Sequence, residues 1–510
     1  MIGSLNTNSV PEVVKQNISG APLALRSRSP FPSRIGPEEI PMAGVKIAGA
    51  VPRRSYIVEL FRVAASQGID IISSSPYASK IEVDLVHGMS ERGASMKIEI
   101  PYGDGIDTVE LADGNIEQVI IPNTVQSADE METLRGAIFR PMKSPGLDAF
   151  LKDRKNILLV VNDATRPTPT GRVMDIIYPM LKGKNFKIII ATGSHRAPTE
   201  EEYDFIFGKL YGELKDRVHV HDAKKSECFS LGKTRHGNEM MLNVLVREAD
   251  AILPIGSIEP HYFAGYTGGR KSFMPGVASY DCITANHKLA ISQAAQAMVL
   301  KGNPVAEEFD DAQMLLEKLN VFAIMTVLDG DHRVYAAAAG DLKESFYSLL
   351  PKADEVFVVP IKRLADIVVT VALEPNDIDL YQSQKALDNG KTALKDGGII
   401  ILVSACRSGI GSQAFMDLLC SEKSCKAVID KLDREYKLGY HKAGKMAEIG
   451  VKAQMWAVTP LDATLIGKAH MRPFDSVSEA VAEALKEKGP GAKVTFIMDG
   501  GMTIPRLTAT

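Results

Sequence analysis

The sequence predicts an α/β protein of two α/β domains with mainly parallel sheets and an active-site cleft between the domains. Two observations carry this prediction. From residue 156 onward, short apolar runs are followed by polar, glycine-rich turns and by helical apolar spacing, at 157–161, 187–190, 217–221 and 251–255. A second series of such runs lies further along the chain, at 367–371, 399–403 and 493–497. This alternation is typical of parallel sheets covered by helices, in which ligands bind where the strands end.

Composition divides the 510 residues into four parts. Six prolines interrupt residues 1–50, which predicts a disordered tail, and residues 51–80 form an appended segment without an assigned role. We expect an N-terminal domain at 81–360 and a C-terminal α/β domain at 361–510. The last strand could belong to either domain. Alternating apolar residues at 117–121 predict a short strand before the main body.

The charge balance and the cysteines restrict the class of function. The 59 basic residues are nearly matched by 63 acidic ones, so the net charge of -4 favours neither a nucleic acid nor an anionic membrane as partner. No apolar run reaches the roughly 18 residues that a membrane span needs. Five scattered cysteines form no Cys-x-x-Cys pair, which predicts a reducing cytoplasm. We therefore expect a cytoplasmic protein that binds a small molecule.

Two motifs directly follow predicted strands of the first series. Residues 162–167 contain Asp163, Thr165 and Arg166, and this arginine could grip a carboxylate or phosphate through two parallel hydrogen bonds. A helix N-cap followed by a surface arginine is an equally good interpretation. The next strand is followed by His195, and histidine is the usual general acid or base because it titrates near neutrality. A structural loop histidine is the alternative.

The densest motif spans residues 259–271 and combines His261, closely spaced glycines, an arginine and Lys271. The backbone N–H groups of such glycines can cradle a phosphate, although the spacing is not that of a Walker loop. A flexible loop with a solvated Arg-Lys pair is the alternative. His287 lies sixteen residues beyond Lys271. One histidine cannot hold a metal alone, so a metal here would need donors from a bound cofactor, and otherwise a packing histidine is expected.

Two patterns belong to the second series. Gln382 and Lys385 are three residues apart and would share one helix face, which could present an amide and a cation to one substrate. A solvated helix start is an equally good interpretation. Gly409 and Gly411 formally match a dinucleotide-binding loop, but no acidic strand end follows at the expected distance. That dinucleotide interpretation is therefore weak.

The remaining histidines carry less information. His219 and His221 would share one face of a strand and could form a metal pair, but no third ligand lies at a recognisable spacing. We expect His441 and His470 at the protein surface.

Taken together, these motifs resemble those of the nickel-dependent lactate racemase family, whose cofactor is a nickel-pincer nucleotide. The resemblance covers about residues 80–500, and the motifs occur in the family's order. The ten-residue step from His261 to Lys271 and the sixteen-residue step from there to His287 are its most specific part.

The resemblance implies a role for each matched residue. Lys271 would hold the nucleotide covalently through a thioamide bond, and His287 would be the ligand that the protein supplies to nickel. His195 and His261 would be the paired acid/base histidines. The groups around the substrate would be Arg166, Tyr381, Gln382 and Lys385. The cofactor would be lined, in a cofactor-binding N-terminal domain, by Asp163, Ala164, Thr165, Arg166, Gly268, Gly269 and Met274.

The implied activity is the inversion of C2 of a 2-hydroxy acid, either lactate or a related 2-hydroxycarboxylate. The C2 hydrogen would leave as hydride to the cofactor while the hydroxyl loses a proton. Return of the hydride to the other face requires a proton donor for either orientation of the carbonyl, which explains two histidines. The implied partners are a small-molecule 2-hydroxy acid and cofactor-synthesis proteins.

Departures from the family pattern put lactate itself in question. Residues 372–375 are Ala-Leu-Glu-Pro where the family usually has Gly-Gly-Tyr-Pro, and no tryptophan lies near Tyr440, where the lactate enzymes have one. Two alternatives stay open. One is an NAD-dependent dehydrogenase that uses the loop at Gly409, and the other is a non-catalytic nickel-nucleotide binding protein.

Overall fold

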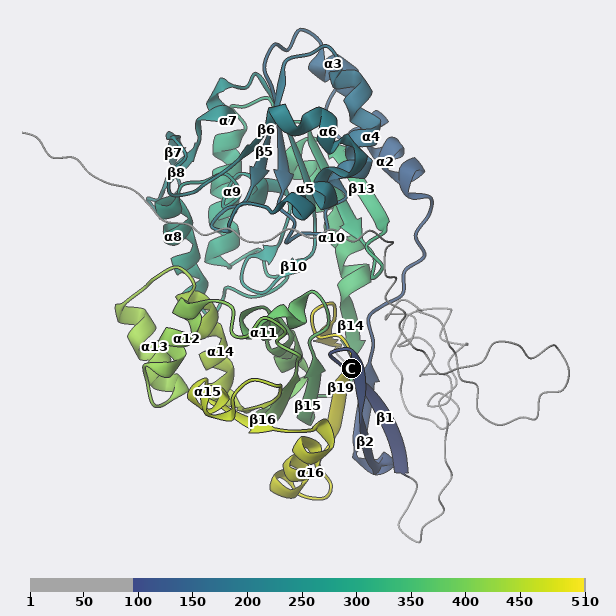
Figure 1. The fold of residues 1–510 in the computed structure, drawn as a ribbon, viewed down its shortest axis with the longest axis vertical. Coiled ribbons are helices and arrows are strands. Elements are labelled where there is room, and N and C mark those ends of the chain that lie inside the picture. The colour runs from purple at the N-terminus through teal and green to yellow at the C-terminus, as the bar shows by residue number, and fades with distance from the viewer. Residues whose placement is uncertain (1–94, 509–510) are drawn as a thin grey trace, which may run out of the picture. The chain divides into compact units, whose positions relative to one another are not determined.

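A six-stranded sheet organises the first half of residues 95–508, the residues that this computed structural model describes (Figure 1). Its strands lie in the order β13-β12-β9-β4-β5-β6, and neighbours are parallel except for the antiparallel pair β12 and β13. The strands are β4 (Ile157–Asn162), β5 (Phe186–Ala191), β6 (Val218–Val220), β9 (Ala251–Ser257), β12 (Ala323–Leu328) and β13 (Val334–Gly340). The predicted tail at 1–50 and the appended segment at 51–80 lie outside the described residues.

Strand β4 explains why these strands are continuous apolar runs. Leu158 and Val160 pack on one face of the sheet, and Ile157, Leu159 and Val161 pack on the other. Neither face meets water, because helices cover both, as is usual for parallel sheets. The Ile157 face is covered by α2 (Glu130–Phe139), α3 (Leu147–Leu151), α4 (Thr170–Leu181), α5 (Glu200–Phe207) and α6 (Tyr211–Leu214). The Leu158 face is covered by α7 (Val244–Glu248), α8 (Tyr280–Lys288), α9 (Pro304–Leu316) and α10 (Leu342–Phe357).

A second six-stranded sheet, parallel throughout, organises the other half in the order β18-β17-β16-β15-β19-β3. Its strands are β3 (Ile116–Ile120), β15 (Ala365–Val371), β16 (Leu394–Val403), β17 (Gln454–Val458), β18 (Met471–Phe474) and β19 (Val494–Ile497). The predicted α/β class with mainly parallel sheets is therefore confirmed.

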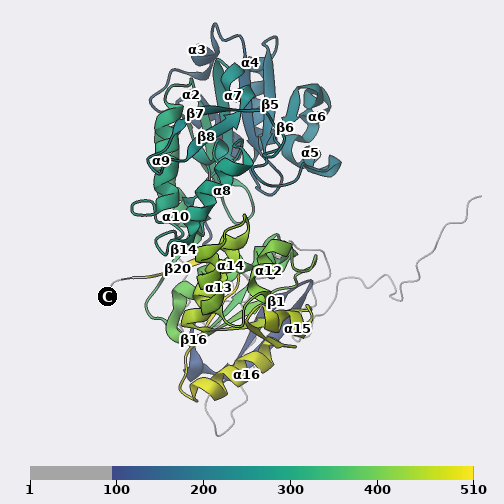
Figure 2. The same ribbon diagram turned by 90° about the vertical axis from the view of Figure 1, so that its left-hand side faces the viewer.

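Helices also cover both faces of the second sheet (Figure 2). One face packs against α11 (Leu380–Gly390), α12 (Gln413–Cys420), α13 (Cys425–Arg434), α14 (Tyr440–Lys452) and α15 (Ala463–Lys468). The other packs against α16 (Val477–Lys488) and the hairpin of β1 (Ser95–Tyr102) and β2 (Gly105–Ala112). Helix α14 also reaches the first half, where Lys445 Nζ donates a hydrogen bond to the Ser292 carbonyl at 3.1 Å.

The chain crosses between the two halves more than once. Strand β3 pairs in parallel with β19, so the residues 116–120 that we expected in the first domain belong to the second sheet. The last strand, β20 (Ile504–Leu507), pairs with β14 (Val358–Ile361) in a separate two-stranded sheet. The domain boundaries drawn from the sequence stay a prediction. Two short antiparallel pairs complete the list, namely β7 (Cys228–Lys233) with β8 (Glu239–Asn243) and β10 (Pro260–His261) with β11 (Gly265–Tyr266).

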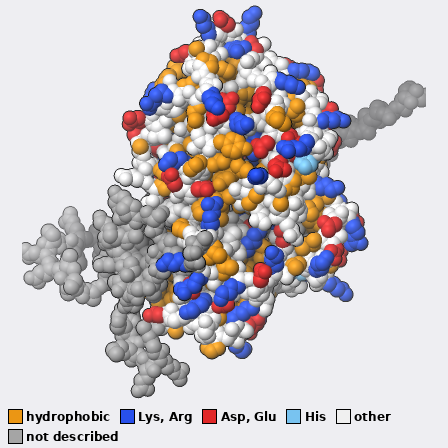
Figure 3. Space-filling model, turned by 180° about the vertical axis from the view of Figure 1, so that it is seen from behind, with side chains coloured by type: hydrophobic (Ala, Val, Ile, Leu, Met, Phe, Trp, Pro, Cys, Tyr) orange, Lys and Arg blue, Asp and Glu red, His pale blue; other side chains and the backbone are white. Residues whose placement is uncertain are grey.

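Charged side chains of both signs are interspersed over the face drawn in Figure 3, which fits the nearly balanced charge of the chain. Within residues 95–508, no helix has the length and apolar character to cross a membrane. The five cysteines are all free thiols, as the sequence led us to expect.

Candidate active site

A cavity of about 600 Å³ lies at one edge of the first sheet, where the chain leaves β4, β5 and β9. These three strands are neighbours and parallel, so the residues after each strand lie close together. The first half contributes Asp163, Arg166, His195, His261, Lys271 and His287 to the walls. The second half contributes Tyr381, Gln382 and Lys385 from α11, and His441 and Lys442 from α14. The cavity is therefore lined by strand ends of the first half and by helices of the second half.

Asp163 orients His195. The Asp163 side chain is 6% exposed, and its Oδ2 lies 2.8 Å from His195 Nδ1, while its Oδ1 accepts a hydrogen bond from the Thr165 hydroxyl at 2.6 Å. Burial opposes the ionisation of Asp163, but these bonds outweigh it and hold the carboxyl pKa below its usual value. The His195 ring is half-exposed to the cavity. A carboxylate on Nδ1 fixes the tautomer of His195, with its proton on Nδ1 and Nε2 free to accept.

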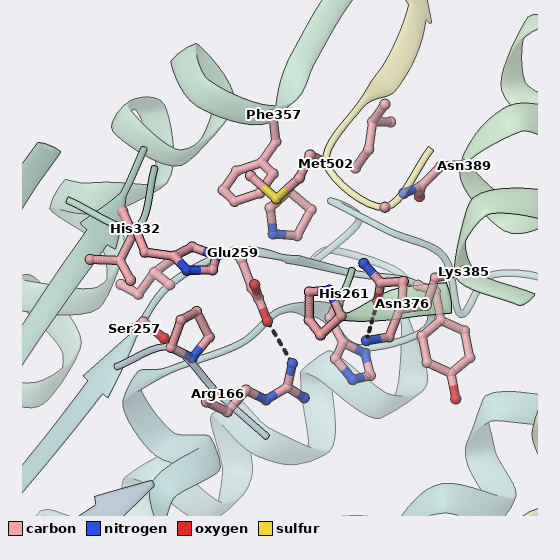
Figure 4. A pocket seen from close by; sticks show the side chains of 18 of the residues that line it. Arg166, Ser257, Glu259, His261, His332, Phe357, Asn376, Lys385, Asn389 and Met502 are labelled. Carbon is pink, nitrogen blue, oxygen red and sulfur yellow. Dashed lines mark hydrogen bonds and ion pairs between the residues drawn. The ribbon is translucent and has the colours of Figure 1, made fainter. Parts of the chain in front are cut away.

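Arg166 is already paired with a carboxylate that the sequence analysis did not single out. Its Nη1 lies 2.5 Å from Glu259 Oε1, and both side chains are 24% exposed (Figure 4). A second cavity of about 100 Å³ adjoins the first and shares the side chains of Arg166, His261 and Lys385 with it. Phe357 and Met502 give this smaller cavity apolar walls. The pair is 93 residues apart in sequence, so no local spacing could predict it.

His261 lies among aromatic rings on the short strand β10. Its ring centroid is 5.0 Å from that of Tyr262 and 4.6 Å from that of Phe263. Burial lowers the pKa of His261 well below its usual value, and the nearby Lys271 and Arg166 side chains lower it further. The backbone N–H of Ala264 donates to His261 Nδ1 at 3.3 Å. Because Nδ1 accepts, the neutral ring carries its proton on Nε2, the opposite tautomer to His195.

Lys271 is a buried amine without an acidic partner among the described residues. Its Nζ lies 5.7 Å from the Phe263 ring and 5.6 Å from the Phe309 ring. Burial lowers the pKa of Lys271 well below its usual value, and the cation of Arg166 lowers it further. These surroundings favour the neutral, nucleophilic form of the amine.

The glycines before Lys271 are required by close packing. Gly268 has a φ of +78°, and a Cβ there would lie 2.7 Å from Ile258 Cγ1 and 2.8 Å from the Ser257 carbonyl oxygen. A Cβ on Gly269 would lie 2.9 Å from the Phe346 ring. The Gly269 N–H donates to Met325 Sδ at 3.2 Å, so it is not directed at a ligand. Gly268 lines the large cavity, whereas Gly269 does not.

His287 and His441 lie side by side in the cavity wall. Their ring centroids are 5.4 Å apart, and each is 5.2 Å from Phe263. His441 was expected at the surface, and this prediction is wrong, because the residue is 4% exposed. Burial lowers the pKa of His441 to about 3, with the charge of Lys442 beside it as a further cause. Burial likewise lowers the pKa of His287 well below its usual value.

The start of α11 brings the second group of predicted residues to the cavity. Asp379 caps this helix by accepting the Gln382 backbone N–H at 2.6 Å, and Gln382 and Lys385 face the cavity together. Lys385 Nζ donates to Asn376 Oδ1 at 3.1 Å. Burial and the nearby Arg166 cation lower the pKa of Lys385 to about 8. Burial raises the pKa of the Tyr381 hydroxyl to about 12, with Asp379 adding to the effect.

Several candidates lie elsewhere or have other partners. Ala164 and Thr165 line the cavity, but Met274 is 1% exposed and packs in the core. His221 has both ring nitrogens bonded, Nε2 to the Ala278 carbonyl at 2.8 Å and Nδ1 to Asn243 at 3.2 Å, so it has no free nitrogen for a metal.

Gly411 is required by close packing, whereas Gly409 has open space around its Cα and a φ of +87°, which favours glycine. A Cβ on Gly411 would lie 2.6 Å from Asp379 Cγ, and the Gly409 carbonyl accepts the Leu380 N–H at 3.0 Å. This loop therefore packs against the start of α11, which accounts for its glycines without a bound dinucleotide.

Two known domain families match this chain. The models of the lactate racemase N-terminal domain and the lactate racemase C-terminal domain match residues 102–298 and 361–504. The lactate racemase of Thermoanaerobacterium thermosaccharolyticum is 32% identical over 426 residues, which are 80% of this chain and 99% of that protein. The chain belongs to the lactate racemase family.

Further relatives support this family membership. The lactate racemase of Lactiplantibacillus plantarum is 28% identical over 417 residues, which are 79% of this chain and 98% of that protein. The solved lactate racemase apoprotein from Thermoanaerobacterium thermosaccharolyticum matches with a TM-score of 0.75 and 30% identity, over 81% of this chain and 100% of that one. A Thermotoga maritima protein structure shares the fold, with a TM-score of 0.57 at 20% identity over 75% of this chain and all of that one. This lactate racemase family member is an isomerase of the racemase type.

The donor set of this family member fits a cofactor that brings its own metal ligands. No group of three or more His, Cys, Asp or Glu side chains within residues 95–508 is arranged to hold a metal ion. His287 Nδ1 is buried and makes no well-formed hydrogen bond. The Ile283 carbonyl, one turn earlier in α8, acts against burial by raising the pKa of His287. Lys271, an amine whose pKa burial lowers well below its usual value, lies in the same cavity. The residues present therefore fit a group that one amine anchors and one imidazole ligates.

Proposed function

We propose that the protein inverts C2 of a 2-hydroxy acid, and that it does so with a nickel-pincer nucleotide attached to Lys271. The observation that carries this proposal is the common cavity of His195, His261, Lys271 and His287. Two acid/base histidines suit a reaction in which the substrate hydroxyl loses a proton to one residue and the carbonyl oxygen receives a proton from the other. A one-way dehydrogenase would need one such residue.

The proposed attachment assigns two residues to the cofactor. Lys271 would hold it covalently, and His287 would complete its metal coordination. When bound, the cofactor supplies an electron-poor pyridinium carbon that takes up and returns the C2 hydrogen as hydride. Cofactor-synthesis proteins in a reducing cytoplasm would have to provide it, and the five free cysteines support such a compartment.

The side chains of the protein move the hydroxyl proton. His195 Nε2 accepts in the tautomer that Asp163 imposes, so His195 takes the hydroxyl proton of one enantiomer. His261 would protonate the carbonyl oxygen from Nε2 when that oxygen points the other way, and it can do so only as an imidazolium, because the neutral ring would become an imidazolate. After one inversion His195 holds the added proton and His261 is neutral. The pair is then ready to invert the other enantiomer.

The substrate carboxylate does not change during the reaction, so it can serve as a fixed pivot. Lys385 offers an ammonium whose one hydrogen-bond partner among the described residues is Asn376. Arg166 is held by Glu259 through Nη1, which orients the guanidinium and leaves its other N–H groups to donate. Gln382 and Tyr381 line the same side of the cavity.

Incubation with single enantiomers tests the proposal. Protein co-expressed with cofactor-synthesis enzymes is given one enantiomer each of a 2-hydroxy-acid panel, and chiral chromatography measures the product. Inversion of at least one member is expected. Stoichiometric formation of NADH would instead favour the dehydrogenase, and intact cofactor with no inversion of any member would favour the non-catalytic binding protein.

A further inference from the structure

Lys442 on α14 is a buried lysine that the proposed reaction does not use. Its side chain is 2% exposed and lines the large cavity. Its Nζ lies 4.0 Å from the centre of the Tyr381 ring and 5.5 Å from that of Tyr262. Within residues 95–508, it forms no hydrogen bond and no ion pair. Burial and the charge of Lys385 lower the pKa of Lys442 well below its usual value, so its ammonium form needs an anion beside it in the cavity.

The acidic groups near Lys442 are committed to other partners. Asp388 pairs with Lys391, and Asp379 accepts the N–H of Gln382. Glu259, which lies near Lys385, pairs with Arg166. Besides burial, the charge of Lys385 lowers the pKa of Lys442. Lys385 itself has only the neutral Asn376 amide as a hydrogen-bond partner. The cavity therefore holds two lysine side chains and no carboxylate that pairs with either.

A substrate with two carboxylates could pair with both lysines. A monocarboxylate with a methyl side chain, such as lactate, would pair with Lys385 and leave Lys442 against an apolar group. A second carboxylate on the substrate would pair with Lys442 and remove the repulsion between the two cations. Lys442 is also close to the reacting atoms, because the Tyr262 ring that it contacts lies 5.0 Å from the His261 ring.

We infer that the substrate is a 2-hydroxydicarboxylate and that Lys442 binds its second carboxylate. This inference rests on the proposed function and narrows its substrate class. The Tyr381 and Tyr262 rings hold the ammonium in place by cation–π contact and exclude water from it. Residues 372–375 are Ala-Leu-Glu-Pro where the family usually has Gly-Gly-Tyr-Pro, and Glu374 and Pro375 line this cavity.

The test compares malate and lactate as ligands and as substrates. Calorimetry on the cofactor-free protein measures the Kd of each acid, and chiral chromatography on loaded protein measures the kcat/KM for inversion. The variants are Lys442→Met, the charge-retaining Lys442→Arg, and Lys437→Met as a control that removes an exposed lysine near the start of the same helix. Thermal unfolding and intact mass are measured for every variant, to monitor folding and cofactor attachment.

We expect wild-type protein to bind and invert malate about tenfold or more better than lactate, as the loss of one charged contact would predict. Lys442→Met should abolish that preference by weakening malate alone, while Lys442→Arg and Lys437→Met keep it. Equal use of malate and lactate by the wild type would overturn the inference. So would a Lys442→Met protein that loses both acids equally, or one that loses its cofactor mass, because Lys442 would then serve a shared carboxylate or the cofactor phosphate.

The two proposals fail in different ways. Inversion of lactate without binding of malate would leave the proposed function standing and overturn the role of Lys442. Selective, Lys442-dependent binding of malate with no inversion of any hydroxy acid would support the anion site and contradict the proposed function.

Discussion

The titration of Lys385 should control how tightly the protein binds a carboxylate. Burial, together with the Arg166 cation, lowers the pKa of Lys385 to about 8. At pH 9 only about one tenth of such side chains keep their proton. If the ammonium binds the substrate carboxylate, the affinity for lactate should fall about tenfold per pH unit above pH 8, and bound carboxylate should raise the pKa of Lys385 in turn.

The substitution Lys385→Arg isolates this effect. A guanidinium stays charged at every pH at which proteins are folded, so the variant should bind lactate with an affinity that hardly changes between pH 7 and 10. Calorimetry on the cofactor-free protein at constant ionic strength measures both profiles. A flat wild-type profile, or the same pH dependence in both proteins, would refute the role of Lys385 as the carboxylate anchor.

The same pKa also predicts a stability effect of definite sign. Lys385 loses its proton at about pH 8 in the folded chain and near 10.5 when unfolded. Between these values the unfolded state binds more protons, so the free energy of unfolding rises with pH across this window. The difference between the two pKa values corresponds to at most about 3 kcal/mol in the free energy of unfolding. The actual effect should be smaller, because the Lys385 side chain is partly open to the cavity. Lys385→Met should therefore raise the unfolding temperature at pH 7, and a lowered value would contradict the burial argument.

Three further predictions concern the histidines and the glycine turn. His195→Ala and His261→Ala should each lower kcat for inversion by roughly 10²- to 10⁴-fold with the cofactor mass unchanged, and full activity of either variant would exclude that residue as acid or base. Asp163→Asn should lower kcat by a similar factor because an amide facing Nδ1 favours the wrong tautomer of His195, and the measurement is the pH profile of kcat. Gly268→Ala should lower the free energy of unfolding in urea by about 1–3 kcal/mol more than Gly237→Ala does. Gly237 is the control because its φ of +81° is nearly equal and its Cα has open space around it. Equal losses in the two variants would exclude a cost from the close contacts at Gly268.

The strand-end residues could be predicted because local patterns carry them. Asp163 and His195 directly follow continuous apolar runs, and such runs in a parallel sheet place their ends at one edge. His261 and Lys271 were found through the density of their motif. Their mutual proximity then follows from the order of β5, β4 and β9 in the sheet, which the structure supplies.

The contribution of α14 could not be predicted. His441, Lys442 and Lys445 are polar residues near the start of a helix, a pattern that normally indicates a solvated face. They are buried because α14 lies against the first half of the chain, with Lys445 bonded to the Ser292 carbonyl and His441 next to Phe263. Contacts between segments 150 or more residues apart in sequence leave no local trace. The same reason explains the pairing of β3 with β19.

Isotope transfer tests the central claim most directly. Loaded protein is incubated in ordinary water with a single enantiomer of a 2-hydroxy acid that carries deuterium at C2, and the product is analysed by chiral chromatography with mass detection. The account predicts inverted product that keeps its deuterium, because the hydrogen leaves and returns as hydride while His195 and His261 move only the hydroxyl proton. Inverted product with hydrogen from water at C2, or no inverted product, would contradict it.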